Sequence, residues 1–418
     1  MQGLNTDTNW SRRCGMLAGM SSAEKTILIL NGGSSSIKFA VFAVEEALRL
    51  TLNGQIERIG TPDGVFSTQG GEHQAHAKRQ VATVDYSDAV KLLVDWIDEK
   101  DIDGTLIAIG HRIVHGGPHF HQPQLLTTSL MAELQHLTPL DKQHMPGEIS
   151  LANALQQRFP KVPQIACFDT AFHQYLPRVA QLLPIPRSHF AQGVRRYGFH
   201  GLSYEFLMSE LLRTDGAMAA GGRIILAHLG NGASLAAVAD GKSIDTSMGF
   251  TPAAGVPMGT RAGDLDPGLV EYMARTENME AKAFDEMVNL KSGLLGISET
   301  SADMRDLLKV EADDARAADA VALFCYQVKK CIGAYAAALG GLDTLVFAGG
   351  IGEKAPLVRS RICAGLAFLG IELDERRNEQ NVEVISVDGG RVKVRVIRTN
   401  EELVIARSAC RVLGIDAA

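Results

Sequence analysis

The sequence predicts an α/β protein built from two similar domains. Segments with strand and helix patterns alternate along most of the 418 residues, which is typical of this class. Each half also begins with the same device: a strand, a short turn of glycines and small polar residues, and a second strand. When residues 33–41 are aligned with residues 230–238, three of nine positions are identical. The recurrence predicts a duplicated fold in which two domains face each other across a cleft.

The first hairpin is expected at residues 27–42. Its arms, 27–30 and 37–42, are rich in apolar, β-branched and aromatic residues, so both favour strands. The turn between them holds Asn31, two glycines and three serines. Backbone N–H groups, hydroxyls and the neighbouring Lys38 would suit a phosphate. A Gly/Ser hairpin without a ligand accounts for the same residues, and the loop alone does not separate the two interpretations.

The first half continues with alternating elements. A strand is expected at 51–59, followed by a helix at 88–98, where the apolar residues have helical spacing. Further strands at 106–109 and 164–167 flank a helix at 150–159. Strands joined by helical connections in this way favour an α/β sheet.

The second half opens on the second hairpin, with strands at 223–227 and 235–238. An alanine-rich helix at 317–339 precedes a strand at 344–348, which runs into a glycine-rich segment and a helix at 356–366. Glycines and a helix N-terminus at the carboxyl end of a strand suit a nucleotide, and a turn needed only for packing is the alternative.

Composition narrows the classes of partner. The formal net charge is −7, and 46% of the residues are hydrophobic and 21% charged, which is ordinary for a globular protein with a large core. The acidic balance argues against nucleic acid or an anionic membrane as the main partner. No apolar run approaches the roughly 18 residues that a membrane span needs. We therefore expect neither a nucleic-acid nor a membrane partner.

The cysteines and the first residues indicate a cytoplasmic location. Six cysteines are scattered without a CxxC pair or a Cys/His metal spacing, so free thiols in a reducing compartment are expected. Residues 1–24 carry only a short apolar run, which is too weak for a secretory signal. We expect them to form an N-terminal extension that is disordered or loosely attached.

Arginine and histidine concentrate in three glycine-containing loops, at 110–117, 195–201 and 258–264. Glycine next to a charged side chain suggests backbone brought close to a ligand. A surface ion pair is the alternative for each arginine taken alone. Three such loops in one chain favour a site for small anions.

Two acids follow predicted strands. Asp169 lies after the strand at 164–167, and Glu401 lies after a strand at 394–399. Carboxylates near phosphates are what a Mg²⁺–nucleotide site needs, whereas Glu401 would also stabilise the start of the last helix. The sequence contains neither the Walker A pattern nor the motif set of protein kinases, so phosphates would have to be held by the hairpins.

These motifs resemble the acetate/propionate/butyrate kinase family. The resemblance runs in order from residue 25 to the C-terminus and rests on long, unusual stretches at 31–39, 110–117, 168–173, 195–201, 228–234, 245–268, 301–305, 349–353 and 399–403. It implies the duplicated actin-like ATPase fold, which is ribonuclease H-like, with domain I formed by 25–170 and 400–418 and domain II by 171–399. It also implies a homodimer that phosphorylates a short-chain carboxylate with ATP by direct in-line transfer.

The resemblance assigns catalytic roles to residues at matching motif positions. Arg112 and Arg261 would grip the substrate carboxylate and the transferring phosphoryl group. His200 would stabilise that group, and His144 would be a second histidine beside it. Asp169 would be a Mg-linked acid that orients Arg261.

Metal, nucleotide and acyl-group contacts follow from the same resemblance. The expected metal ligands are Asn31 and Glu401, with Mg²⁺ or alternatively Mn²⁺ as the ion. The expected nucleotide contacts are Lys38, Ser34, Ser36, His228, Asn231, Gly232, Asp303, Met304, Arg305, Gly350, Ile351 and Lys354. The expected substrate pocket is formed by Arg112, Val114, Gln143, Phe199 and Pro252.

The sequence departs from the family pattern at informative positions. Gln143 replaces a leucine of the acyl pocket, and a buried amide without a partner is costly. The acid is therefore open: acetate leads, and propionate or another short-chain carboxylate is the alternative. Lys354 stands where the family usually has asparagine, next to the nucleotide. Tyr204 replaces a histidine that usually follows the 198–201 turn.

The physics of in-line transfer agrees with these roles. A carboxylate nucleophile is already deprotonated at pH 7, so no general base is required. Two arginines, a histidine and Mg²⁺ supply charge where it builds up on the phosphoryl oxygens. An actin-like ATPase or nucleotide-binding module without acyl transfer is the competing hypothesis, and a bare ATPase would not need a carboxylate clamp.

Overall fold

The computed structural model describes residues 25–416 except 34, 71–75, 82–84 and 101–103. The expected N-terminal extension and Ser34 lie outside the described residues. Within them, no helix combines the length and apolar character that crossing a bilayer requires.

The first sheet has the strand order β5-β4-β3-β2-β1-β6-β8-β7. β1 (Thr26–Gly32) pairs antiparallel with β2 (Ser36–Val44) and parallel with β6 (Leu106–Ile113). β3 (Leu48–Glu57) extends the sheet beside β2, and β8 (Gln164–Phe168) runs parallel to β6. The outer strands are β4 (Val65–Gly70), β5 (His76–Gln80) and β7 (Gln124–Leu125).

The second sheet repeats the central five strands of the first. Its order is β11-β10-β9-β12-β13, with β9 (Ile224–Leu229) antiparallel to β10 (Ala233–Ala239) and parallel to β12 (Thr344–Ala348). β11 (Lys242–Thr246) pairs antiparallel with β10, and β13 (Lys393–Val396) pairs parallel with β12. Order and directions match those of β3-β2-β1-β6-β8. The prediction of a duplicated α/β fold is therefore confirmed.

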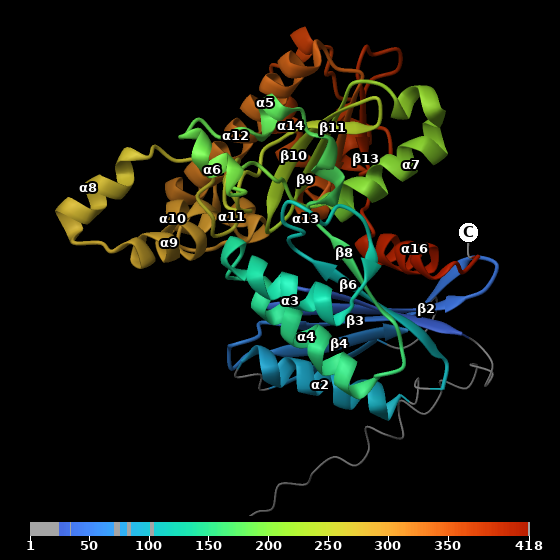
Figure 1. Ribbon diagram of the computed structural model, residues 1–418. Coiled ribbons are helices and arrows are strands. Elements are labelled where there is room, and N and C mark those ends of the chain that lie inside the picture. Colours follow the sequence, from blue (N-terminus) through green and yellow to red (C-terminus); the bar gives the residue numbers. More distant parts are fainter. Residues whose placement is uncertain (1–24, 34, 71–75, 82–84, 101–103, 417–418) are drawn as a thin grey trace, which may run out of the picture.

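Helices cover both sheets (Figure 1). α2 (Tyr86–Glu99) and α4 (Met145–Arg158) pack on the first sheet, and α12 (Ala315–Leu339) packs on the second. The longer remaining helices are α3 (Thr128–Leu137), α7 (Gly201–Ala220), α8 (Gly268–Glu277), α9 (Ala281–Leu290), α11 (Met304–Val310), α14 (Pro356–Cys363) and α16 (Glu401–Leu413). The short ones are α5 (Arg178–Gln181), α6 (Arg187–Ala191), α10 (Gly293–Ser298), α13 (Gly349–Lys354) and α15 (Glu375–Glu379).

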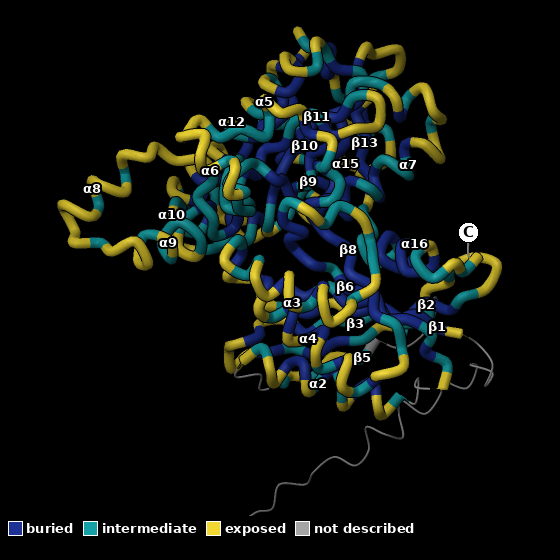
Figure 2. The backbone as a smooth tube through the Cα atoms, viewed as in Figure 1, coloured by how far each residue is buried: buried dark blue, intermediate teal, exposed yellow. Residues whose placement is uncertain are grey.

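Helices α7 and α16 join the two halves. They contact each other, and their buried apolar residues form one cluster with residues of β1 and β6 from the first sheet and of β9 and β12 from the second. The last helix α16 thus returns to the first sheet at the C-terminal end of the chain (Figure 1). Figure 2 shows buried stretches along β8, β9, β10 and part of α16, with exposed residues on the outer loops. The packing fixes where the first turn of α16, and with it Glu401, lies.

Local sequence signals set the ends of several helices. Asp85 forms a capping box with Asp88 at the start of α2, and Asn400 caps α16 by accepting the N–H of Leu403. Gly340, with φ of +68°, ends α12 in the left-handed conformation that glycine adopts most easily.

Several element boundaries differ from the sequence prediction. α4 begins at Met145 rather than at residue 150, and β13 ends at Val396 rather than at residue 399. β6 continues past the predicted end at residue 109 to Ile113, because the ladder with β8 pairs Arg112 with Cys167. The glycine-rich residues that follow β12 form a short helix, α13, rather than a turn.

Candidate active site

A cavity of about 510 Å³ opens where both hairpins and the ends of several strands meet. It is lined from the first half of the chain by Asn31, Gly33, Ser35, Ser36, Lys38, Arg112, Val114, His144 and Asp169. From residues 199–402 it is lined by Phe199, His200, His228, Gly230, Asn231, Gly232, Pro252, Arg261, Gly349, Gly350, Glu353, Arg398, Thr399, Glu401 and Glu402. Residues of both halves therefore share one site, as the duplicated fold predicts.

The two hairpins present equivalent turns to this cavity. In the first, the N–H of Gly33 donates to the Ser36 carbonyl at 2.7 Å, and Asn31 stands opposite Lys38 on the paired strands. In the second, the N–H of Gly230 donates to the Gly232 carbonyl at 2.9 Å. Each turn brings backbone close to the cavity together with small polar side chains. This arrangement suits phosphate oxygens.

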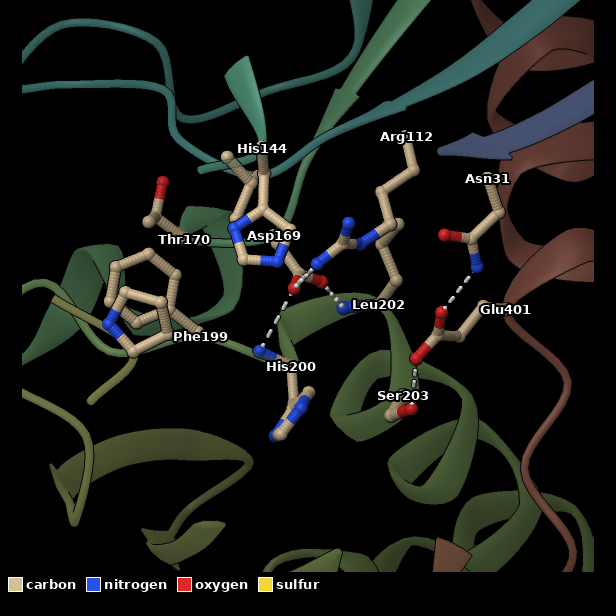
Figure 3. A network of polar contacts seen from close by, with 12 residues as sticks. Asn31, Arg112, His144, Asp169, Thr170, Phe199, His200, Leu202, Ser203 and Glu401 are labelled. Atoms are coloured by element: carbon tan, nitrogen blue, oxygen red, sulfur yellow. Dashed lines mark hydrogen bonds and ion pairs between the residues drawn. The ribbon is translucent and has the colours of Figure 1, made fainter. Parts of the chain in front are cut away.

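Arg112 is held by three acceptors on its inner side. Its Nη2 donates to Asp169 Oδ2 at 2.8 Å, and its Nη1 donates to the Gly32 carbonyl at 3.1 Å and to Glu148 Oε1 at 3.2 Å. Asp169 also accepts the backbone N–H groups of His200 and Leu202, as Figure 3 shows. The ion pair places the guanidinium at the edge of the cavity.

The expectation that Asp169 orients Arg261 is wrong. Asp169 pairs with Arg112, which the ladder between β6 and β8 places beside it. Arg261 Nη1 instead donates to the Pro252 carbonyl at 3.1 Å. No carboxylate of the described residues forms an ion pair with Arg261.

The environment of Arg261 is that of an anion site. Burial lowers the pKa of Arg261, and Arg112 adds to this, while Asp141 acts in the opposite direction. A partly buried guanidinium without a counter-ion is electrostatically costly until an anion arrives. Its place in the cavity therefore fits a bound phosphoryl group or carboxylate.

His200 adopts a strained backbone conformation at the start of α7. Its φ is +58°, in the left-handed region that non-glycine residues rarely occupy, and such strain is found at functional positions. Burial, with His228 and both arginines nearby, lowers the pKa of His200 well below its usual value, so the ring is neutral. The rings of His200 and His228 lie 4.4 Å apart.

A chain of hydroxyls selects the tautomer of His200. The Tyr204 hydroxyl is fully buried and lies 2.5 Å from Ser234 Oγ, which lies 2.9 Å from His200 Nδ1. If Tyr204 donates to Ser234, Ser234 donates in turn to Nδ1, and the ring proton resides on Nε2. Nε2 is next to the second hairpin, since a Cβ at Gly232 would lie 3.2 Å from it. His200 can thus donate a hydrogen bond into the cavity.

His144 is oriented by an acid rather than by a hydroxyl. Its Nδ1 lies 3.0 Å from both carboxylate oxygens of Asp141. Burial acts to raise the pKa of Asp141, but the hydrogen bonds from His144 and neighbouring N–H groups bring that pKa below its usual value. The ionised carboxylate keeps a proton on Nδ1, and the ring lines the cavity.

Asn31 and Glu401 lie side by side and fit a divalent cation. Asn31 Nδ2 donates to Glu401 Oε2 at 2.8 Å, and Ser203 Oγ donates to Oε1 at 2.5 Å (Figure 3). Although burial opposes it, the charge of Arg112 lowers the pKa of Glu401. No cluster of three metal-binding side chains occurs among the described residues. One carboxylate and one amide oxygen match Mg²⁺, which takes its other ligands from phosphates and water.

Four of the five residues predicted for the acyl pocket line the cavity. Val114, Phe199 and Pro252 line the cavity together with Arg112. Gln143 does not: it is exposed, and its backbone N–H donates to Asp141. The tight loop before α4 turns its side chain to solvent, so Gln143 does not change the polarity of the pocket.

Six of the expected nucleotide contacts line the cavity: Ser36, Lys38, His228, Asn231, Gly232 and Gly350. Asp303, Met304, Arg305, Ile351 and Lys354 lie outside its lining. Asp303 caps α11 and pairs with Arg305, Met304 is buried, and Lys354 is exposed. The segment before α11 still reaches the second hairpin, because a Cβ at Gly259 would lie 2.4 Å from Asn231 Oδ1 and 3.2 Å from the Ala302 carbonyl.

Several cavity residues were not among the predicted site residues. All eight adjoin motifs that the sequence does reveal: Gly33, Ser35, Gly230, Gly349, Glu353, Arg398, Thr399 and Glu402. Glu148, which contacts Arg112 and Val114 but does not line the cavity, was missed altogether. Its spacing from Leu151, Ala152 and Leu155 places an acid on the apolar face of a helix, and that signal could have identified it.

Comparisons with known proteins agree with this geometry. Residues 26–407 match the model of the Acetokinase family. A propionate kinase of Citrobacter rodentium is 41% identical over 92% of this chain and 96% of its own, and an acetate kinase of Rhodopseudomonas palustris is 42% identical over 92% and 98%. Among solved structures, a propionate kinase from Francisella tularensis superposes with a TM-score of 0.86 at 35% identity, covering 93% and 99% of the two chains. An acetate kinase from Porphyromonas gingivalis does so with 0.82 at 34%, covering 93% and 100%.

Proposed function

Because this chain belongs to the Acetokinase family, we propose that it is an ATP-dependent kinase that converts acetate reversibly to acetyl phosphate. The observation that carries the proposal is the meeting of two phosphate-type hairpins and two partly buried arginines in one cavity. Among the described residues, Arg261 has no acidic partner, and some N–H groups of Arg112 have no protein acceptor and can bind a substrate anion. A module that only hydrolyses ATP would not need this second anion site.

In the proposed mechanism, the acid lies against Val114, Phe199 and Pro252 with its carboxylate toward Arg112. The γ-phosphoryl group lies between the hairpins, where Arg261 and the Nε2–H of His200 can stabilise charge on its equatorial oxygens. The carboxylate attacks phosphorus directly, the bond to the ADP oxygen breaks, and no base is required. These positions favour in-line transfer.

The divalent ion of the proposed mechanism is Mg²⁺. Asn31 and Glu401 would hold it beside the first hairpin. When bound, it would neutralise charge on the nucleotide phosphates. In this scheme Asp169 acts by positioning Arg112, because its Oδ2 accepts a hydrogen bond from Arg112 Nη2.

Propionate is the second candidate substrate, because a propionate kinase is among the relatives with 41% identity. The exposed side chain of Gln143 removes the reason the sequence offered for a more polar pocket. Trapping of the acyl phosphate with hydroxylamine tests the activity, and kcat/KM for acetate, propionate and butyrate ranks the acids. ATP hydrolysis without a trapped product would reject the proposal in favour of a plain ATPase.

The adenosine pocket of the proposal combines Gly350 and Ile351 with the segment Asp303, Met304 and Arg305. We place the nucleotide base there because this segment approaches Asn231 from the side of α11. Lys354, exposed at the end of α13, would contact the nucleotide from the rim. Ser34 completes the first hairpin on the basis of sequence alone.

We further propose a cytoplasmic homodimer with domain I at 25–170 and 400–418 and domain II at 171–399. The described cysteines are all free, which suits a reducing compartment. α8 and α9 contain no buried residue and form an arm that projects from the second half (Figure 1). Val270, Tyr272 and Leu290 are exposed on this arm, as an interface would require. Light scattering on the purified protein would measure the oligomeric state.

A further inference from the structure

Glu148 is a buried acid that does not line the cavity itself but contacts Arg112 and Val114, two residues of the proposed acyl site. It lies in the first turn of α4, its residue is only 2% exposed, and its helix face otherwise carries Leu151, Ala152 and Leu155. A carboxylate in such a place is costly unless its oxygens are hydrogen-bonded. Both oxygens of Glu148 have partners.

The partners of Glu148 are two parts of the proposed acyl site. Its Oε2 accepts the backbone N–H of Val114 at 2.9 Å, and its Oε1 accepts from Arg112 Nη1 at 3.2 Å. Arg112 supplies the guanidinium for the carboxylate, and Val114 supplies apolar wall. The Glu148 carboxylate thus sets the distance between the Arg112 guanidinium, which is the polar part of the pocket, and Val114, which belongs to its apolar wall.

Glu148 and Asp169 compete for the same cation. Arg112 bonds both acids, and when both are ionised its charge is more than balanced before any substrate arrives. Two acids that share a site do not ionise with equal ease. Burial raises the pKa of Glu148 to about 8, although Arg112 and the Val114 N–H pull it down. Ionisation of Glu148 therefore falls within the range of ordinary assays.

The groups around Glu148 support this assignment. Arg112 faces it from β6, and Asp169 at the end of β8 and Asp141 before α4 both raise its pKa. From α2, Tyr86 lies close by, since a Cβ at Gly32 would lie 2.6 Å from the Tyr86 hydroxyl and 3.4 Å from Glu148 Cγ. Burial raises the pKa of Tyr86, and the charge of Glu148 adds to this, so its hydroxyl is neutral.

We propose that Glu148 is a positioning residue whose charge state controls how strongly Arg112 attracts the substrate carboxylate. The inference rests on the proposed function. With Glu148 protonated, Arg112 has one anionic protein partner and can bind the anionic acid. With Glu148 ionised, the substrate carboxylate approaches the two carboxylates of Glu148 and Asp169. Binding of the substrate then requires Glu148 to take up a proton from solvent.

Steady-state kinetics across pH test the proposal, with KM for acetate and for ATP measured separately by ADP release. In the unmodified enzyme, KM for acetate should rise roughly tenfold from about pH 7 to about pH 9, as one titrating group with a pKa near the middle of that range requires. KM for ATP should change little. Glu148→Gln should flatten the acetate profile, because the amide imitates the protonated acid.

Two variants separate charge from a merely structural role. Glu148→Asp keeps the charge but is too short to bridge Arg112 and Val114, so it should retain the pH dependence and lose kcat. Glu205→Gln removes a glutamate on α7 whose pKa burial also raises and which lies 3.6 Å from Arg411, outside the cavity; its profile should match the unmodified enzyme.

The outcomes are distinguishable from a failure of the proposed function. If no carboxylate yields a trapped acyl phosphate, the function itself is wrong. If acyl phosphate forms but KM for acetate in the unmodified enzyme is flat with pH, the role of Glu148 is overturned, and this holds even if Glu148→Gln does not fold. Identical sloping profiles for the unmodified enzyme and a folded Glu148→Gln would overturn it as well.

Discussion

The guanidinium of Arg112 and the carboxylate of Asp169 form a buried ion pair, with Nη2 2.8 Å from Oδ2. The same carboxylate accepts the backbone N–H groups of His200 and Leu202, where α7 begins. One acid therefore joins the end of β8, a side chain of β6 and the strained residue that starts α7. Its loss should affect both stability and catalysis.

Asp169→Ala tests the structural part of that role. Removing one partner of a buried pair leaves the other charge uncompensated, which costs about 3–5 kcal/mol. We expect the free energy of unfolding in urea to fall by an amount in that range, and activity to fall with it. Asp98→Ala, which removes an exposed partner of Arg158, should change stability by less than about 1 kcal/mol. Equal stability of the two variants would contradict the role assigned to Asp169.

Arg261→Ala should abolish turnover while leaving the fold intact. Among the described residues, the Arg261 guanidinium has only one hydrogen bond to a protein carbonyl and a weak contact with Met258 Sδ, so little structure depends on it. An arginine that stabilises a phosphoryl-transfer transition state contributes about 10³–10⁵ in rate. Measurements of kcat and of melting temperature, with the exposed Arg213→Ala as control, check both parts. Near-normal kcat would exclude Arg261 from the reaction.

Arg112→Ala should also lose most of its turnover, with a larger rise in KM for the carboxylate than for ATP. The reason is position: Arg112 lies beside Val114 at the acyl end of the cavity, and its other contacts are to Asp169, Glu148 and the Gly32 carbonyl. A variant whose acetate KM is unchanged would show that another residue binds the acid.

Tyr204→Phe removes the hydroxyl that orders the chain from Ser234 to His200. Without it, Ser234 can accept from Nδ1, and the tautomer that places a proton on Nε2 loses its advantage. We expect kcat to fall roughly 10–100-fold, by analogy with the loss of the hydrogen-bond partner that orients a metal-ligating histidine. KM should stay close to its original value. Tyr326→Phe, at an exposed position of α12, is the matched control. A loss confined to stability would argue for a packing role.

Glu401→Gln should increase the concentration of Mg²⁺ needed for half-maximal activity. The substitution keeps the size of the side chain and removes the charge that would hold the cation beside Asn31. Mg²⁺ titration at saturating ATP measures the effect, and Glu99→Gln at the exposed end of α2 provides the control. An unchanged Mg²⁺ requirement would remove Glu401 from the proposed metal site.

Much of the fold was predictable because its signals are local. Apolar and β-branched runs indicated the strands of both hairpins, helical spacing indicated α2, and alanine-rich composition indicated α12. The repeated hairpin indicated duplication, which the two matching strand orders confirm. The length of β6 was less predictable, since its last residues are strand only because β8 lies beside them.

The sequence by itself determined the hairpins, their polar turns and the arginine and histidine loops, because these depend on neighbours in the chain. Only the tertiary structure decided which charges meet. Asp169 pairs with Arg112 rather than Arg261, Gln143 turns to solvent, and Glu148 reaches the pocket from behind. Such partners come from different elements, and their distances follow from how helices and sheets pack. Burial then fixes their charges, because the cost of ionisation depends on the surroundings rather than on the residue type.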